Sequence, residues 1–83
     1  PNPFNPVTTI GFSLAETGAV SLKVYNVKGQ LVKVLVDGER SAGHHQALWH
    51  GRNEDGEDVA SGVYFYRLES GAQTLTKRML LMK

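Results

Sequence analysis

Apolar and polar residues alternate with a period of two along most of this chain, and turn-forming residues interrupt the alternation roughly every 8 to 12 residues. Successive side chains of a β-strand point to opposite faces, so this pattern is typical of strands with one buried face. In the first stretch, for example, Ile10, Phe12 and Leu14 share one face, while Gly11 and Ser13 lie on the other. No segment shows the helical period. The pattern therefore predicts an all-β chain.

The turn signals divide the chain into short strands. Glycine-containing turns are expected near residues 16–18, 28–30, 37–39, 42–43, 55–56, 61–62 and 70–72. The strands between them are expected to cover residues 8–14, 20–25, 31–36, 44–50, 64–68 and 73–82, and a short piece at Val59 would add a seventh. We therefore predict an antiparallel, immunoglobulin-like β-sandwich of about seven strands.

One strand fits two local structures. The run Leu31–Val36 is apolar on both parities apart from Lys33. This pattern indicates either a strand that is covered on both faces or a strand that carries a β-bulge. Both structures remain open from the sequence.

The inward-facing positions define an expected core, with Trp49 as its anchor because a buried tryptophan is common in such sandwiches. The core residues that we predict are Ile10, Phe12, Leu22, Val24, Trp49 and Leu68.

The length of 83 residues fits one domain. Residues 1–6, Pro-Asn-Pro-Phe-Asn-Pro, are expected to be a linker from an upstream domain, and residues 7–83 the folded module. Because the chain does not open with a methionine, we expect an excised part of a larger protein. With 41% hydrophobic and 20% charged residues and no apolar run near the ~20 residues of a membrane span, the composition is that of a globular fold without a transmembrane segment.

Composition also excludes several functions. The chain lacks cysteine, which excludes disulfides, thiolate metal sites and a cysteine nucleophile. The formal charge is +1 and the basic residues are scattered, so there is no stripe that could follow nucleic-acid phosphates. We expect no nucleic-acid partner.

Histidine is a common metal ligand, but the three histidines are poorly placed for one ion. His44 and His50 share a strand face yet lie roughly 20 Å apart along an extended chain, and His44 and His45 point to opposite faces. We predict no metal site and no cofactor.

The acidic loop at residues 53–58 has some features of a calcium loop. If Gly56 took the place of the invariant glycine, however, Gly51 and Gly62 would stand where ligands are required. A solvated turn is the favoured interpretation, with a looser calcium site as the alternative.

No catalytic group is apparent. Ser61 and Ser70 lie in turns without a positioned base, and the acids crowd loops, apart from Glu69 near a strand end. We therefore predict that the module is not an enzyme.

A sugar-binding platform is the alternative that the aromatic residues raise, because flat rings stack on pyranose faces. Its members would be Trp49, Tyr64, Phe65 and Tyr66. Burial of these side chains in a small core is the competing prediction.

Several short motifs form a series along the whole chain. They are Pro3-Phe4-Asn5-Pro6, Val24-Tyr25-Asn26, Gly43-His44, Trp49-His50-Gly51, residues 61–68 and residues 77–83. The series resembles the C-terminal sorting domains of proteins exported by the type IX secretion system of Bacteroidetes and relatives. It is also similar, more loosely, to the immunoglobulin-like domain of the flagellar hook-capping protein.

The resemblance implies a secreted or cell-surface, non-catalytic sorting and attachment module. Its implied partners are an outer-membrane translocon with its sorting machinery and an upstream cargo domain of the same polypeptide. The positions that match the family's motifs are Pro1, Asn2, Pro3, Gly62, Tyr64 and Lys83. His50 departs from the family, whose members often carry Asp or Asn there.

Each of these positions also has a physical interpretation. Gly62 would permit an unusual backbone conformation or a close approach, Tyr64 would bury its ring and bond its hydroxyl, and Lys83 would be an exposed charge that keeps an apolar end in solution. A carbohydrate-binding module and a structural immunoglobulin-like spacer are the two alternative functions.

Overall fold

The computed structural model describes residues 6–83, and these residues form six strands without a helix. None of them therefore belongs to a helix that could cross a membrane. The strands are β1 (Thr8–Leu14), β2 (Gly18–Asn26), β3 (Leu31–Arg40), β4 (Gly43–Trp49), β5 (Gly62–Ser70) and β6 (Gln73–Leu81).

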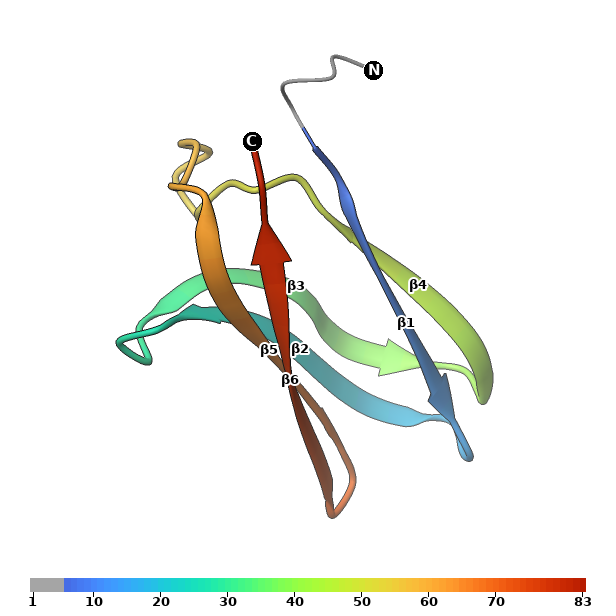
Figure 1. The fold of residues 1–83 in the computed structure, drawn as a ribbon. Coiled ribbons are helices and arrows are strands. Elements are labelled where there is room, and N and C mark those ends of the chain that lie inside the picture. The colour runs from blue at the N-terminus through green and yellow to red at the C-terminus, as the bar shows by residue number, and fades with distance from the viewer. Residues whose placement is uncertain (1–5) are drawn as a thin grey trace.

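Two antiparallel sheets of unequal width make up the fold (Figure 1). β1 and β4 form a two-stranded sheet, and the order β3-β2-β5-β6 forms a four-stranded one. The all-β, antiparallel sandwich predicted from the alternation is confirmed, with six strands instead of about seven. The expected strand at Val59 is absent, because that segment is a loop whose only ladder contact is the single bridge Arg52–Asp58.

β3 extends beyond its expected end at Val36. A turn was expected at Asp37-Gly38-Glu39, but these residues belong to the strand. These residues continue the ladder with β2, where Ala19 pairs with Glu39 and Gly18 with Arg40. Backbone pairing with a neighbouring strand therefore outweighs the local preference of this segment for a turn.

The ambiguity at Leu31–Val36 is resolved by two irregularities in the β2–β3 ladder. The register shifts after Leu22, where the partner changes from Val36 to Val34, and again after Val24. Leu35 and Val32 are the residues that are skipped. A bulge interrupts the alternation of a strand, which explains how the skipped residue Leu35 packs against the core although its neighbour Val36 is buried there as well.

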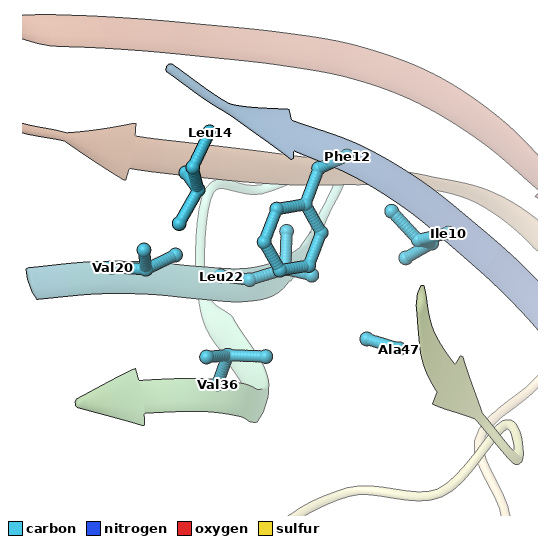
Figure 2. Close-up of a cluster of buried hydrophobic side chains, with 7 residues drawn as sticks. All are labelled: Ile10, Phe12, Leu14, Val20, Leu22, Val36 and Ala47. Carbon is cyan, nitrogen blue, oxygen red and sulfur yellow. The ribbon is translucent and has the colours of Figure 1, made fainter. Parts of the chain in front are cut away.

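The core lies between the sheets in two adjoining clusters. The first contains Ile10, Phe12, Leu14, Val20, Leu22, Val36 and Ala47 (Figure 2). The second contains Val24, Val32, Trp49, Tyr64 and Leu81, and Leu35 and Met79 pack against both.

The structure places five of the six expected core residues, Ile10, Phe12, Leu22, Val24 and Trp49, among the buried ones. Leu68 is the exception, because it is only partly buried at the border of the first cluster.

Two adjacent leucines of β6 provide a test of this arrangement. Leu81 is 1% exposed and packs in the second cluster, whereas Leu80 is 61% exposed on the opposite face. We expect Leu81→Ala to lower the free energy of unfolding by about 2 to 5 kcal/mol, because it leaves a cavity, and Leu80→Ala to lower it by no more than about 0.5 kcal/mol. Urea denaturation of both variants measures this, and equal losses would contradict the assignment of faces.

Candidate functional site

The predicted site residues on β4, β5 and the C-terminal end meet at the loop of residues 51–61, which we call the end loop. Trp49 ends β4 immediately before it and is 1% exposed. Its indole Nε1–H donates to the carbonyl oxygen of Arg52 at 3.0 Å. The ring meets Tyr64 edge to face with centroids 5.0 Å apart. Trp49 therefore fills the core and fixes the first turn of the end loop at once.

Gly51 allows the chain to make that turn. Its φ is +70°, a conformation that side chains other than glycine rarely adopt, and a Cβ there would lie 3.3 Å from a methyl carbon of Leu81. Its carbonyl oxygen accepts a hydrogen bond from the backbone N–H of Val59 at 3.0 Å. The two ends of the end loop are thereby held together.

Asn53 organises the acidic part of the end loop. Its side-chain oxygen accepts from the backbone N–H groups of Asp55 and Glu57, both at 3.0 Å, and its own N–H donates to the carbonyl of Glu57. The Asn53 side-chain oxygen is thus used to build an Asx-type turn.

The carboxylates of this segment point to different partners. Glu54 accepts from the backbone N–H of Val34 and lies 3.7 Å from Lys33, while Asp58 lies 3.4 Å from Arg52 and 3.5 Å from Lys83. Across residues 6–83 there is no group of three histidine, cysteine or acidic side chains that could hold a metal ion.

Tyr64 connects β5 to the end loop. Its ring is buried against Trp49, and its hydroxyl donates to the carbonyl oxygen of Ala60 at 2.6 Å. Burial raises the pKa of the Tyr64 phenol above its usual range, because the charged form would lose its hydration. The hydroxyl is a structural donor here.

Gly62 takes the first of its two expected roles, and Lys83 differs from its prediction. Gly62 has φ +149°, an unusual backbone conformation that accounts for glycine, and a Cβ there would have no atom within 4 Å, so the alternative of a close approach does not apply. Lys83 is not a free charge. Its backbone N–H donates to Ser61 Oγ at 3.0 Å, and its Nζ lies 3.3 Å from the carbonyl oxygen of Gly51, with only 21% of the side chain exposed.

Pro1, Asn2 and Pro3 lie outside the described residues.

The histidines take separate roles at the surface. The Nδ1 of His44 lies 2.6 Å from Ser13 Oγ, and His45 stacks on Phe12 while its Nε2 lies 2.7 Å from the carbonyl oxygen of Ser41. His50 is exposed. The hydrogen bond that an acid would make from position 50 to the following loop is not needed, because Trp49 and Gly51 hold that loop.

The four aromatic residues considered as a sugar platform do not share an exposed face. Trp49 and Tyr64 are buried, and Tyr66 is half-buried against the core. Phe65 follows Tyr64 in β5 and lies on the other face of the sheet. An exposed aromatic strip therefore cannot be built from these residues.

The sequence did not indicate how much the site depends on backbone groups and on Ser61. Carbonyl oxygens of Gly51, Arg52 and Ala60 accept the side-chain bonds that join the end loop to the sandwich. Every residue has a backbone carbonyl, so the residue types do not indicate which carbonyls accept these hydrogen bonds. The contacts could therefore not be predicted from the sequence.

Removal of the Tyr64 hydroxyl tests its structural role. We expect Tyr64→Phe to cost about 1 kcal/mol of unfolding free energy, because the Ala60 carbonyl loses its donor. Since the folded state keeps the phenol proton to higher pH than the unfolded state, wild-type stability falls as pH rises above about 10, the usual tyrosine pKa. The difference in unfolding free energy between wild type and Tyr64→Phe should therefore become smaller above this pH. Denaturation curves at several pH values measure it. Tyr66→Phe is the control, and an equal loss in that variant would contradict this role.

Comparison with known proteins shows which family has this fold. No curated protein matches the chain. Among solved structures, the crystal structure of FlgD from P. aeruginosa is similar, with a TM-score of 0.72 at 21% identity, which supports the fold. The similarity covers 92% of this chain and 61% of the FlgD chain, so the module spans less than two thirds of that protein. A model of the FlgD Ig-like domain matches residues 5–74. The chain belongs to the family of FlgD Ig-like domains.

Proposed function

We propose that the chain is a non-catalytic, structural immunoglobulin-like module of a longer protein, where it acts as a spacer or scaffold. The observation that carries the proposal is that polar side chains at the end loop form hydrogen bonds within the fold. Those that could carry chemistry at the end loop, Trp49, Tyr64 and Lys83, all bond to the backbone carbonyls of that loop. They stabilise one end of the sandwich and present no converging polar groups to a substrate.

Family membership supports the same function, because the flagellar hook-capping resemblance is to a structural protein and the match is to its Ig-like domain. The geometry around the aromatic residues favours this proposal over carbohydrate binding. Two of the four rings of the suggested platform, those of Trp49 and Tyr64, are buried in the core.

A sorting and attachment module remains our second proposal, and one feature of the end loop favours it. Gly62, Tyr64 and Lys83, which match the sorting-domain motifs, lie together at the end loop, the first two in β5 and Lys83 two residues after β6. Their hydrogen bonds serve the structure under either proposal, so it is the position of these motif residues at one end of the module that favours sorting. Under this proposal the module is exported, follows a cargo domain, and is recognised by an outer-membrane translocon at this end.

A domain exchange distinguishes the two proposals. The module would be replaced in its parent protein by an unrelated immunoglobulin-like domain of similar length, and by a deletion. A spacer predicts that the exchange preserves the parent's export and function while the deletion impairs function. Loss of export in the exchanged protein, with the parent still folded, would contradict the spacer role and favour sorting.

The sorting proposal has a sharper test at Lys83, with a matched control. Lys83→Ala and Asp58→Asn both remove the ion pair of 3.5 Å, but only the first changes residue 83. Each should lower stability by about 1 to 2 kcal/mol, because Lys83→Ala also removes the bond from Nζ to the Gly51 carbonyl and Asp58→Asn also removes the ion pair with Arg52.

The measurement is surface display of a reporter fusion in a type IX-competent host, together with the melting temperature of each variant. Recognition of Lys83 predicts that display is lost in Lys83→Ala and retained in Asp58→Asn at similar melting temperatures. Equal display in both variants would remove Lys83 as a recognition residue, and failure of the wild-type fusion to be exported would contradict sorting.

A further inference from the structure

The unequal widths of the two sheets leave part of the sandwich uncovered. Only β1 and β4 face the four strands of the other sheet. As a result, the first six residues of β6, Gln73–Arg78, are all exposed, and the β5–β6 hairpin projects from the body of the fold (Figure 1). A cavity of about 880 Å³ opens between β1 and this hairpin. We call it the β1–β6 groove.

One wall of the β1–β6 groove is the edge of a strand. β1 pairs only with β4, so its other edge has no ladder partner among residues 6–83. The groove is lined by every residue from Ile10 to Leu14, including Gly11 and Ser13, which occupy the positions of β1 that face away from the core. Residues of both parities line a groove only where it runs along the backbone, so its wall is a row of unpaired N–H and C=O groups.

The floor of the groove is apolar and carries the positive charge of Lys77, and Glu16, in the turn between β1 and β2, lines the groove as well. Tyr66 and Leu68 of β5 lie directly opposite Lys77 and Leu75 of β6, and all four line the groove. Leu75 is 46% exposed, although it shares its sheet face with the buried Leu81. Lys77 lies on this inner face and forms no ion pair with the described residues. An inward-facing lysine is a known way to protect an uncovered sheet from non-specific pairing.

We propose that the β1–β6 groove binds an extended segment of a partner protein, which adds to the free edge of β1 as a third strand of the smaller sheet. The segment would alternate apolar and polar residues and carry a carboxylate on its inward face. Its backbone would satisfy the β1 edge, its apolar side chains would cover Leu68 and Leu75, and its carboxylate would pair with Lys77.

The groove fits such a segment better than it fits a second copy of this chain. The inward-facing side chains of β1, β2 and β3 are already packed in their own core. β6 is the strand with a free inner face, but a second β6 would bring a second Lys77 into a groove that already holds this positive charge. A partner segment that brings a carboxylate avoids both conflicts, and it is independent of whether the module is a spacer or a sorting signal.

The test uses synthetic peptides and two variants of adjacent residues. The probe is a capped peptide of about eight residues that alternates valine and threonine and carries one glutamate at a valine position. A second peptide has lysine in place of the glutamate, and a third has the same composition without the alternation. Lys77→Glu reverses the charge inside the groove, while Arg78→Glu makes the same change on the outer face of β6.

We expect the glutamate peptide to bind the wild-type chain in calorimetric titration and to slow amide hydrogen exchange at Ile10–Leu14. Lys77→Glu should lower the affinity for the glutamate peptide by about fivefold to tenfold and raise the affinity for the lysine peptide. Arg78→Glu should change either affinity by no more than about twofold. Melting curves of the two variants verify that both remain folded.

Three results would overturn the proposal. The first is the absence of binding by any alternating peptide, or equal binding of the non-alternating one. The second is slowed exchange at the β3 or β6 edge in place of β1. The third is a dimer of the chain alone in sedimentation, with slowed exchange at Ile10–Leu14, because the occupant would then be a second copy.

Discussion

The hydrogen bond from the Trp49 indole to the Arg52 carbonyl is the interaction on which the rest of the end loop depends. Trp49 is buried to 1% exposure, so its single donor must find an acceptor inside the protein. The backbone supplies one only by turning sharply at Gly51, which brings the Gly51 carbonyl within reach of Val59 and Lys83. One buried polar group thus determines the path of the chain between β4 and β5.

The two ends of the sandwich therefore have different properties. At the end loop, side chains and carbonyls are bonded to one another, and Leu81 closes the core beneath them. At the opposite end, β1 faces the projecting β5–β6 hairpin across a groove, and Leu75 and Lys77 lie uncovered. Side-chain hydrogen bonds to the backbone are thus concentrated at the end loop, and the unpaired edge of β1 lines the groove.

Alternation was a sound guide to the sheets and the core, because a strand with one buried face must place apolar residues at every second position. It failed where pairing depends on partners distant in sequence. The turn expected at Asp37–Glu39 became strand through its pairing with β2, and Leu68 stayed half-buried because no strand of the smaller sheet covers that region. Lys83 appeared as a free charge because its acceptors are the Gly51 carbonyl and the Ser61 hydroxyl, which residue type alone does not associate with a terminal lysine.

We conclude that the polar groups of the end loop stabilise the fold and are not held open for a ligand. Native-state hydrogen exchange measures this directly at three amides that donate within it: Glu54 to Val32, Val59 to Gly51, and Lys83 to Ser61. We predict that the Glu54 and Val59 amides exchange with free energies close to that of global unfolding, and that Lys83 is protected to a lesser but measurable degree. Exchange of all three at the rates of an unstructured chain, while the amides of β2 and β5 remain protected, would contradict the account.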